Sequence, residues 1–384
     1  MRGQQSIDFW LFIPAFILGA LGIVMVYSSS MYFAMDENGS SSYFVKKQAL
    51  YLVISLIAMI ICTRLNYRGY SKIGKYLLIF GYILLLVLLA QRVFHWAHYR
   101  HWEVYRWFRF GFLSFQPSEV VKLILVIYLA GTITSMGERI RDFKNGFVWV
   151  IGVIMLTFTL IFLEPSLSMA SLSLIVGFYI LFIGRAKLAH ILLCFVPAVP
   201  VIIYLVFTKE YMMDRIAGYV NKDPSVWSQV GQSIIGIGNG GFLGLGLGNS
   251  VQKYYFLPER HTDFIFSILA EELGFAGTSL VLILTLIFVW RGFKIAKEAP
   301  DTFGFLLASG LSFMIGIQVF INIGVAIGLL PTTGVTLPFI SYGGSSLLLS
   351  FVATGILLNI SKQGNMEQRL SREYGTRIQK RFPS

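Results

Sequence analysis

Long apolar stretches separated by short polar segments dominate the chain. Ten of them approach the roughly 20 residues that a helix needs to cross the hydrocarbon core of a bilayer. Each is predicted to be helical, because lipid offers no hydrogen-bond partners to backbone N–H and C=O groups, whereas a helix satisfies them internally. The predicted spans are residues 9–28, 47–63, 76–92, 117–135, 147–163, 166–183, 188–207, 264–290, 302–327 and 344–360. The pattern predicts an all-α, polytopic membrane protein in which residues 1–360 form a single integral membrane domain.

The composition agrees with this pattern. Hydrophobic residues make up 56% of the 384 residues and charged residues only 13%, about half the charged fraction of a soluble domain. In a soluble protein the net charge of +12 would suggest a nucleic-acid ligand. A chain that is mostly lipid-facing has no basic face for such a ligand, so no nucleic-acid partner is predicted.

The distribution of lysine and arginine predicts the orientation, because short cytoplasmic loops retain positive charge. With the amino terminus inside, the cytoplasmic segments carry the whole excess of +12 and the outward segments are formally neutral. Both termini are therefore predicted to be cytoplasmic, and residues 361–384 form a basic tail suited to anionic lipid head groups. The outward segment 208–263, between the seventh and eighth spans, is by far the longest, so chemistry is expected to face outward.

A glycine-rich run, residues 236–248, formally satisfies the G-x-G-x-x-G pattern through Gly236, Gly238 and Gly241. A dinucleotide site also needs a preceding strand and a following helix in a βαβ unit, and neither is predicted here. Two interpretations remain. The run is either a flexible or re-entrant loop whose glycines permit close backbone approach, or a set of backbone amides that helps to hold an anionic ligand.

Asp263 stands at the mouth of the eighth span, directly after Glu259-Arg260-His261-Thr262. An ionised carboxylate at the end of a lipid-embedded helix costs free energy unless it is solvated or paired, which makes it a candidate for function. The structural alternative is a helix N-cap, since aspartate at a helix start accepts backbone N–H bonds.

Glu119 and Lys122 lie three residues apart at the outer end of the fourth span, on one helical face. They form either a structural ion pair that neutralises both charges, or the wall of a site in which Lys122 faces an anion. Arginine can grip a diphosphate through two parallel hydrogen bonds. The candidate arginines for such a contact on the outward segments are Arg106, Arg109, Arg215 and Arg260.

Polar residues also occur within and between the last spans. Glu271 and Glu272 in the eighth span, and Gln318 and Asn322 on one face of the ninth, are expected to point into the bundle. Residues 331–346 combine prolines, glycines and hydroxyls, with Ser345 as a candidate substrate contact. Non-helical backbone at this depth is tolerated only where it is buried in protein or lines a cavity.

These motifs resemble the SEDS family of bacterial cell-wall proteins, whose members include FtsW, RodA and SpoVE. The resemblance covers nearly the whole chain. Its most specific stretches are Gln116-Pro117-Ser118-Glu119 with Lys122, Leu257-Pro258-Glu259 with His261 to Phe266 and Glu271-Glu272-Leu273-Gly274, and Pro331 through Ser346. The run 244–250 looks more like the FtsW/SpoVE branch than RodA.

The chain departs from the family pattern at two places. The family often shows Gln-Pro-Asp between the fifth and sixth spans, whereas this chain has Glu164-Pro165-Ser166, so no role of that aspartate is carried over. Arg260 replaces a small or neutral residue and adds a cation beside the candidate site.

The resemblance implies a peptidoglycan glycosyltransferase that polymerises lipid II, an undecaprenyl-diphosphate-linked disaccharide, into glycan strands. The essential aspartate of the family matches Asp263, which is expected to be the general base of an inverting transfer. The residues expected to contact substrate are Arg109, Glu119, Lys122, Arg215, Arg260, His261 and Ser345.

The implied partners are lipid II, membrane lipid, a class B penicillin-binding transpeptidase and other membrane proteins of the division machinery. The implied location is the bacterial plasma membrane at the division septum, with an extracytoplasmic active site. No resident cofactor is expected, although a divalent cation, Mg²⁺ or Mn²⁺, on the diphosphate is left open. No metal site is predicted, because His95, His98 and His101 lack convergent carboxylates or thiolates. A lipid II flippase and a scaffold for the transpeptidase remain as alternatives.

Overall fold

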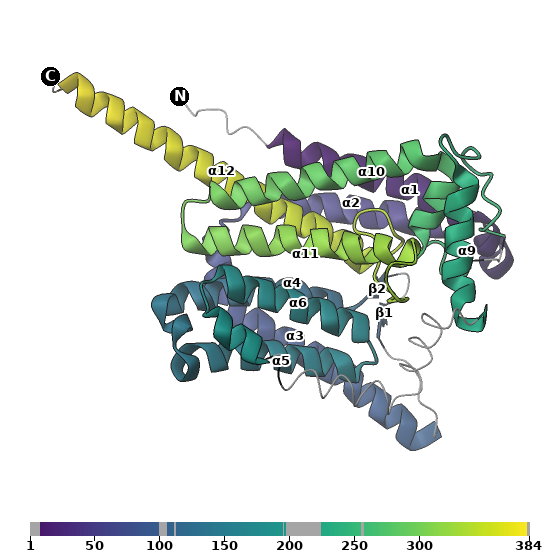
Figure 1. Cartoon of the computed structure of the whole chain (residues 1–384), viewed down its shortest axis with the longest axis horizontal. Coiled ribbons are helices and arrows are strands. Elements are labelled where there is room, and N and C mark those ends of the chain that lie inside the picture. Colours follow the sequence, from purple (N-terminus) through teal and green to yellow (C-terminus); the bar gives the residue numbers. More distant parts are fainter. Residues whose placement is uncertain are drawn as a thin grey trace.

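The computed structural model describes residues 8–99, 106–110, 113–194, 196, 224–254 and 257–381. These residues are almost entirely helical (Figure 1). The long helices are α1 (Phe9–Asn38), α2 (Tyr43–Arg64), α3 (Arg68–Tyr99), α4 (Pro117–Met136), α5 (Val148–Leu163), α6 (Leu167–Ile183), α9 (Pro224–Gly240), α10 (Ile265–Lys297), α11 (Thr302–Ala326) and α12 (Gly344–Arg381). Two single-turn helices, Gly137–Arg141 and Phe143–Phe147, connect α4 to α5.

The predicted polytopic membrane architecture is confirmed. Eight helices in the described part of the chain are long and apolar enough to cross a membrane, and α6 is a shorter apolar helix. They account for every predicted span except the seventh. Of that span, residues 188–194 are helical, and the remainder apart from Val196 lies outside the described residues. Exposed apolar side chains on α3, such as Phe80 and Ile83, suit a surface that faces lipid.

Three elements, a pair of short strands and one helix, were not predicted. Residues Phe108–Phe110 (β1) and Leu113–Phe115 (β2) pair antiparallel, with Arg109 opposite Ser114, and form a short strand pair in an otherwise all-α fold. Helix α9 occupies part of the segment 208–263, which the sequence pattern treats only as a loop.

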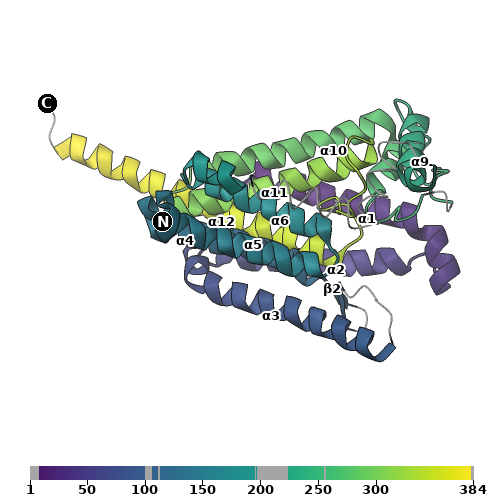
Figure 2. The ribbon, with the colours of Figure 1, turned by 60° about the horizontal axis from the view of Figure 1, so that its bottom comes forward.

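The helices form two groups that lie side by side (Figures 1 and 2). Helices α3, α4, α5 and α6 make up one group, and α1, α2, α10, α11 and α12 the other. Helix α4 joins them, since it contacts both α11 and α12. Helix α12 packs against α1, α2, α4, α10 and α11, and most of its apolar stretch is buried, which makes it the central helix of the bundle.

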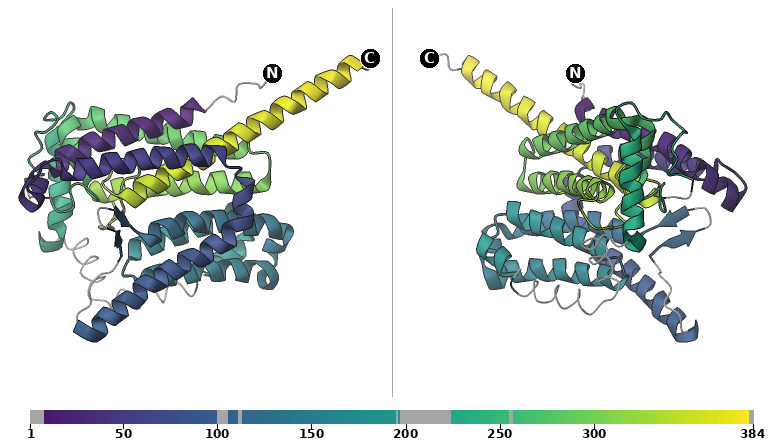
Figure 3. Two further views of the ribbon diagram at one scale, coloured as in Figure 1. Left: turned by 180° about the vertical axis from the view of Figure 1, so that it is seen from behind. Right: turned by 45° about the vertical axis from the view of Figure 1, so that its right-hand side comes forward.

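The first and the last described helices have their outer ends at the same end of the bundle (Figures 1 and 3). Helix α1 begins and α12 ends there, and we refer to it as the terminal end and to the opposite one as the loop end. At the terminal end Arg291 forms an ion pair of 2.7 Å with Asp8. Helix α12 continues without a break through residue 360 to Arg381, so the predicted basic tail is a helical extension of the last span.

Helix α10 is broken at Gly274, whose backbone adopts φ 65° and ψ −164°. The glycine-rich run lies against this break. The N–H of Phe275 donates to the carbonyl oxygen of Gly241 at 2.9 Å, and the N–H of Leu245 donates to that of Glu271 at 3.0 Å. The loop and the broken helix therefore satisfy each other's backbone groups.

Close approach explains why glycine is needed here. A Cβ at Gly244 would lie 2.2 Å from the backbone oxygen of Glu272, and one at Gly274 would lie 2.3 Å from the nitrogen of Gly244. Both positions also have positive φ, which only glycine adopts without strain. The loop with close backbone approach is observed for the glycines that follow α9, whereas Gly236 and Gly238 lie within that helix.

Two buried carboxylates also hold the loop that follows α9 through hydrogen bonds. Glu272 accepts hydrogen bonds from Ser28 Oγ at 2.6 Å and from Lys253 Nζ at 3.1 Å. Glu271 accepts one from Ser250 Oγ. The pair points into the bundle as predicted. Glu272 bonds to α1 and to the loop, and Glu271 bonds to the loop.

Candidate functional site

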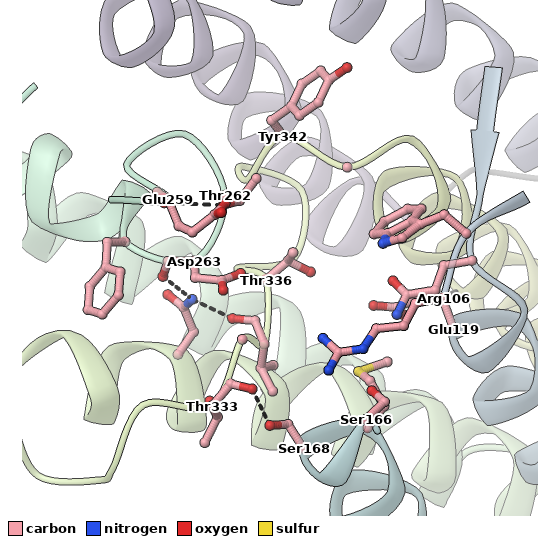
Figure 4. A pocket seen from close by; sticks show the side chains of 18 of the residues that line it. Arg106, Glu119, Ser166, Ser168, Glu259, Thr262, Asp263, Thr333, Thr336 and Tyr342 are labelled. Atoms are coloured by element: carbon pink, nitrogen blue, oxygen red, sulfur yellow. Dashed lines mark hydrogen bonds between the residues drawn. The ribbon is translucent and has the colours of Figure 1, made fainter. Parts of the chain in front are cut away.

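A polar pocket of about 950 Å³ lies at the loop end. Its walls are the end of α1, the start of α2, the β1–β2 region, the start of α4, the α5–α6 connection, the segment before α10, and the segment 332–343 (Figure 4). The charged residues that line it within the described part of the chain are Glu37, Lys47, Arg106, Glu119, Glu259 and Asp263.

Asp263 lines this pocket, with its side chain among the lining groups in Figure 4. Helix α10 begins at Ile265 with Phe264 as its N-cap residue, so the N-cap interpretation of Asp263 is wrong. The Nδ2 group of Asn322 donates to the backbone oxygens of Asp263, at 2.8 Å, and Val335, at 2.7 Å. This amide fixes the aspartate against the non-helical segment and leaves its carboxyl on the pocket wall.

The segment between α11 and α12 has no regular structure around the pocket and is held by hydrogen bonds instead. Ser341 Oγ donates to the backbone oxygen of Thr262 at 2.6 Å and accepts from the N–H of Leu337 at 2.8 Å. The N–H of Tyr342 donates to the backbone oxygen of His261 at 2.9 Å. The expectation that this segment is buried or lines a cavity is confirmed.

Glu119 and Lys122 form an ion pair of 2.7 Å, with only 4% and 2% of the two residues exposed. Lys122 Nζ also donates to Gln318 Oε1 at 2.9 Å, and Gln318 Nε2 donates to the Thr336 oxygen at 3.3 Å. Glu119 lines the pocket, whereas Lys122 lies behind it. The geometry is that of the structural ion pair, with its acidic member facing the cavity.

His261 and Arg260 lie beside the site rather than on its surface. The His261 ring packs against Phe33 and Phe44, with ring centroids 5.7 and 4.9 Å away. Burial lowers the pKa of His261 to about 4, the Arg260 charge acts in the same direction, and Glu259 opposes it. His261 is thus neutral at pH 7, while the Arg260 guanidinium lies 5.3 Å from the centroid of the Phe33 ring.

The remaining predicted contacts are placed as follows. Ser345 Oγ accepts the N–H of Gln116 at 2.9 Å, so it joins α12 to the start of α4 behind the pocket. Arg109 belongs to β1, but its side chain lies outside the described residues, as do Arg215 and the side chains of His95, His98 and His101. No group of three or more His, Cys, Asp or Glu side chains that could hold a metal ion occurs among the residues described.

Two further residues belong to the pocket region. Arg106 lines the pocket and donates to the backbone oxygens of Glu164, at 3.4 Å, and Pro165. The Glu164 side chain lies just behind, 1% exposed, and neither carboxyl oxygen has a hydrogen-bond partner in the described part of the chain. Burial raises the pKa of Glu164 to about 8, against the opposing charge of Arg106. The sequence signal for a special role of Glu164 was that the family often has glutamine at this position.

The family described as "Cell cycle protein", FTSW_RODA_SPOVE, matches residues 9–366. The chain belongs to the FtsW/RodA/SpoVE family. Within it, the chain is 38% identical over 362 residues to stage V sporulation protein E of Bacillus subtilis, covering 94% of this chain and 98% of that protein. It is 36% identical over 364 residues to a probable peptidoglycan glycosyltransferase FtsW of Geobacter sp. strain M18, with the same coverage.

Solved structures of the FtsW/RodA/SpoVE type share the fold. A chain described under "Structural coordination of polymerization and crosslinking by a peptidoglycan synthase complex" matches with a TM-score of 0.77 and 26% identity, over 94% of this chain and 98% of that one. Thermus thermophilus rod shape determining protein RodA matches with a TM-score of 0.64 and 26% identity, over 93% and 97%. The higher identities to SpoVE and FtsW agree with the predicted branch.

Proposed function

We propose that this protein is a peptidoglycan glycosyltransferase that polymerises lipid II into glycan strands. The observation that carries the proposal is Asp263, which lines a polar pocket of about 950 Å³ built from the segments most specific to the family. Names of relatives, such as probable peptidoglycan glycosyltransferase FtsW, support the same activity.

The chemistry proposed for Asp263 is general base catalysis. Its carboxylate takes the proton of the acceptor 4-hydroxyl while that oxygen attacks the anomeric carbon of the donor. The bond from this carbon to the lipid diphosphate breaks, and the diphosphate keeps the electron pair. An α-linked donor and a β-linked product require inversion, so one base and an in-line displacement suffice without a protein nucleophile.

Asp263 does not have to be a strong base for this step. An ordinary aspartate has a pKa near 3.9, so departure of the diphosphate supplies most of the driving force. Cations near the diphosphate lower the barrier, because negative charge develops there in the transition state. A divalent cation, Mg²⁺ or Mn²⁺, would enter with the substrate as a counter-ion of the diphosphate.

The proposal includes the setting of the reaction. The pocket lies at the loop end, opposite the end at which α1 begins and α12 ends (Figure 1). With those helix ends on the cytoplasmic side, as we propose, the pocket opens on the extracytoplasmic side of the plasma membrane. There it would meet lipid II and a class B penicillin-binding transpeptidase, together with other membrane proteins of the division septum. The relative that belongs to a peptidoglycan synthase complex supports such a partner.

The test uses the full chain, purified with its transpeptidase partner and supplied with lipid II. Asp263→Asn is expected to reduce glycan polymer by about 10²- to 10⁴-fold, the usual contribution of a general base. The matched control is Asp142→Asn, the same change at an exposed residue of the terminal end. Absence of polymer from the wild-type complex, or equal polymer from Asp263→Asn, would contradict the assignment. Lipid translocation without polymer would favour the flippase alternative. Absence of both activities would favour the scaffold alternative.

A further inference from the structure

One wall of the pocket carries an arginine in a fixed orientation. Arg106 immediately precedes the β1–β2 region, and its guanidinium reaches the connection between α5 and α6, where the backbone oxygens of Glu164 and Pro165 accept hydrogen bonds. A guanidinium is a planar fork of five N–H donors, so two carbonyl contacts define its plane. Figure 4 shows Arg106 and Asp263 on different sides of the pocket.

This placement matches the geometry of an inverting displacement. The attacking oxygen and the leaving group lie on opposite sides of the reacting carbon, so the base and the group that receives the leaving anion belong on different walls. Asp263 lies on one wall and Arg106 on the other. Of the predicted cations whose side chains are described, Lys122 is held behind the pocket by Glu119 and Arg260 packs over Phe33, so neither of these two lines the cavity.

We propose that Arg106 binds the diphosphate of the lipid-linked donor, and that the buried Glu164 beside it is a positioning residue that controls how far the charge of Arg106 is offset. This inference rests on the proposed function for the identity of the ligand. The chemistry suits the pair, because arginine matches phosphate oxygens with two parallel hydrogen bonds and lysine does not.

The surroundings of Glu164 explain why its charge state depends on Arg106. The neighbouring helices bring few titratable groups to it. Helix α6 contains no Asp, Glu, His, Lys or Arg. From α3, Arg92 donates to the oxygen of Leu163, and from α4 the acid Glu119 is paired with Lys122. Arg106 is the charged group that acts on the carboxyl of Glu164.

A pH dependence follows with a defined sign. Burial raises the pKa of Glu164 to about 8, so the carboxyl is protonated at pH 7 and ionises as the pH rises through that value. Its negative charge then offsets the charge of Arg106 and repels an anionic ligand. Affinity for a diphosphate is therefore highest below pH 8 and falls above it. By linkage, a bound diphosphate raises the pKa of Glu164 further.

The test measures equilibrium binding of a polyprenyl diphosphate to the detergent-solubilised full chain between pH 6.5 and 9.5, with the polyprenyl alcohol as the uncharged probe. Wild type is expected to bind the diphosphate about tenfold more weakly at pH 9.5 than at pH 7, which corresponds to one unit of change in the pKa of Glu164 on binding. Glu164→Gln, which keeps the shape but cannot ionise, is expected to remove this decrease.

Arg106→Lys keeps a charge but loses the fork. It is expected to weaken diphosphate binding about tenfold or more across the pH range and to leave alcohol binding unchanged. The matched controls are Glu138→Gln and Arg141→Lys, an exposed pair at the terminal end. Thermal melting of each variant verifies the fold, and Arg106→Lys replaces an alanine variant that would leave two carbonyls without their donor.

Three results would overturn the inference: no diphosphate binding by wild type, an alkaline decrease that persists in Glu164→Gln, or equal losses of diphosphate and alcohol binding in Arg106→Lys. The binding assay needs no catalysis, so its outcome is separate from that of the polymerisation assay. Arg106-dependent binding without any polymer would contradict the proposed function and keep this site. Polymerisation by the wild type together with unaltered diphosphate binding in Arg106→Lys would support the proposed function and contradict this site.

Discussion

Lys122 lies where α4 meets α11, with both of its polar contacts inside the protein. A buried ammonium is costly to desolvate, and its contacts with Glu119 and Gln318 repay that cost only while all the partners are present. The three side chains connect the helix group of α4 with that of α11 and, through Thr336, with the pocket segment. At this scale the candidate site depends on a residue that does not line it.

Removal of the Lys122 charge is therefore predicted to destabilise the protein more than removal of the pair. Lys122→Met leaves the carboxylate of Glu119 buried without its cation, at a cost of about 3–5 kcal/mol. The double variant Glu119→Gln/Lys122→Met is expected to recover most of this loss, because no buried charge remains. Equilibrium unfolding in detergent measures both effects. Lys187→Met at an exposed position is the control, and equal losses in the single and double variants would contradict the prediction.

At the scale of single elements, α10 shows how a membrane helix can be interrupted. The break at Gly274 exposes backbone groups, and the loop that follows α9 supplies their partners. Loop and helix are thus one structural unit, and it lies on the same helix, α10, that begins just after Asp263. The glycines are needed because two backbones approach closely, not because the loop is loose.

Gly244→Ala is predicted to damage this unit. The new Cβ would lie 2.2 Å from the backbone oxygen of Glu272 at a residue with φ of +81°, for a loss of about 2–4 kcal/mol in the free energy of unfolding. Gly238→Ala is the matched control, since it lies in α9 with no atom within 4 Å of a new Cβ. It is expected to be neutral or to stabilise by about 0.5–1 kcal/mol. Thermal melting and limited proteolysis measure both, and similar behaviour of the two variants would argue against the docking.

At the scale of the whole molecule, the two ends of the bundle differ in chemistry. The terminal end carries exposed ion pairs such as that of Arg68 with Asp301, whereas the loop end holds the pocket. Orientation in the membrane decides which compartment the pocket serves.

The predicted orientation can be tested with single cysteines in a chain that lacks Cys62 and Cys194. A cysteine at residue 37, which lines the pocket, is expected to react with a membrane-impermeant thiol reagent on intact cells. One at residue 138, an exposed position of the terminal end, is expected to react only after the cells are opened. The opposite pattern would reverse the topology and remove the pocket from the extracytoplasmic side.

Much of this architecture could be predicted from the sequence, because the requirement for internal hydrogen bonds in lipid is strict. Apart from the seventh span, each of the spans predicted between residues 9 and 360 is a helix in the structure. Helix α9 was missed because glycines and polar residues interrupt its sequence, so it has no apolar stretch long enough for a span. The β1–β2 pair was missed because strands of three residues leave no pattern to detect.

The candidate site was harder to predict. Asp263 and Glu119 were found because charges at membrane helix ends are unusual, and both line the pocket. The positions of Lys122, Arg260 and Ser345 behind it depend on side-chain direction, which spacing along the chain does not define. Arg106 was one of several outward arginines, and only the fold brings it to the Glu164–Pro165 connection.

The non-helical segment before α12 has a consequence for how mutations are tolerated. In a helix each backbone bond depends on neighbours four residues away, so most apolar exchanges on the lipid-facing surface of α3 leave the backbone intact. The backbone of the segment is held instead by individual side chains, such as Ser341 within it and Asn322 from the neighbouring helix α11. Single exchanges there remove contacts that no neighbouring residue can replace. The protein therefore combines broad regions of high mutational robustness with one short strip of very low robustness, which is the strip that shapes its pocket.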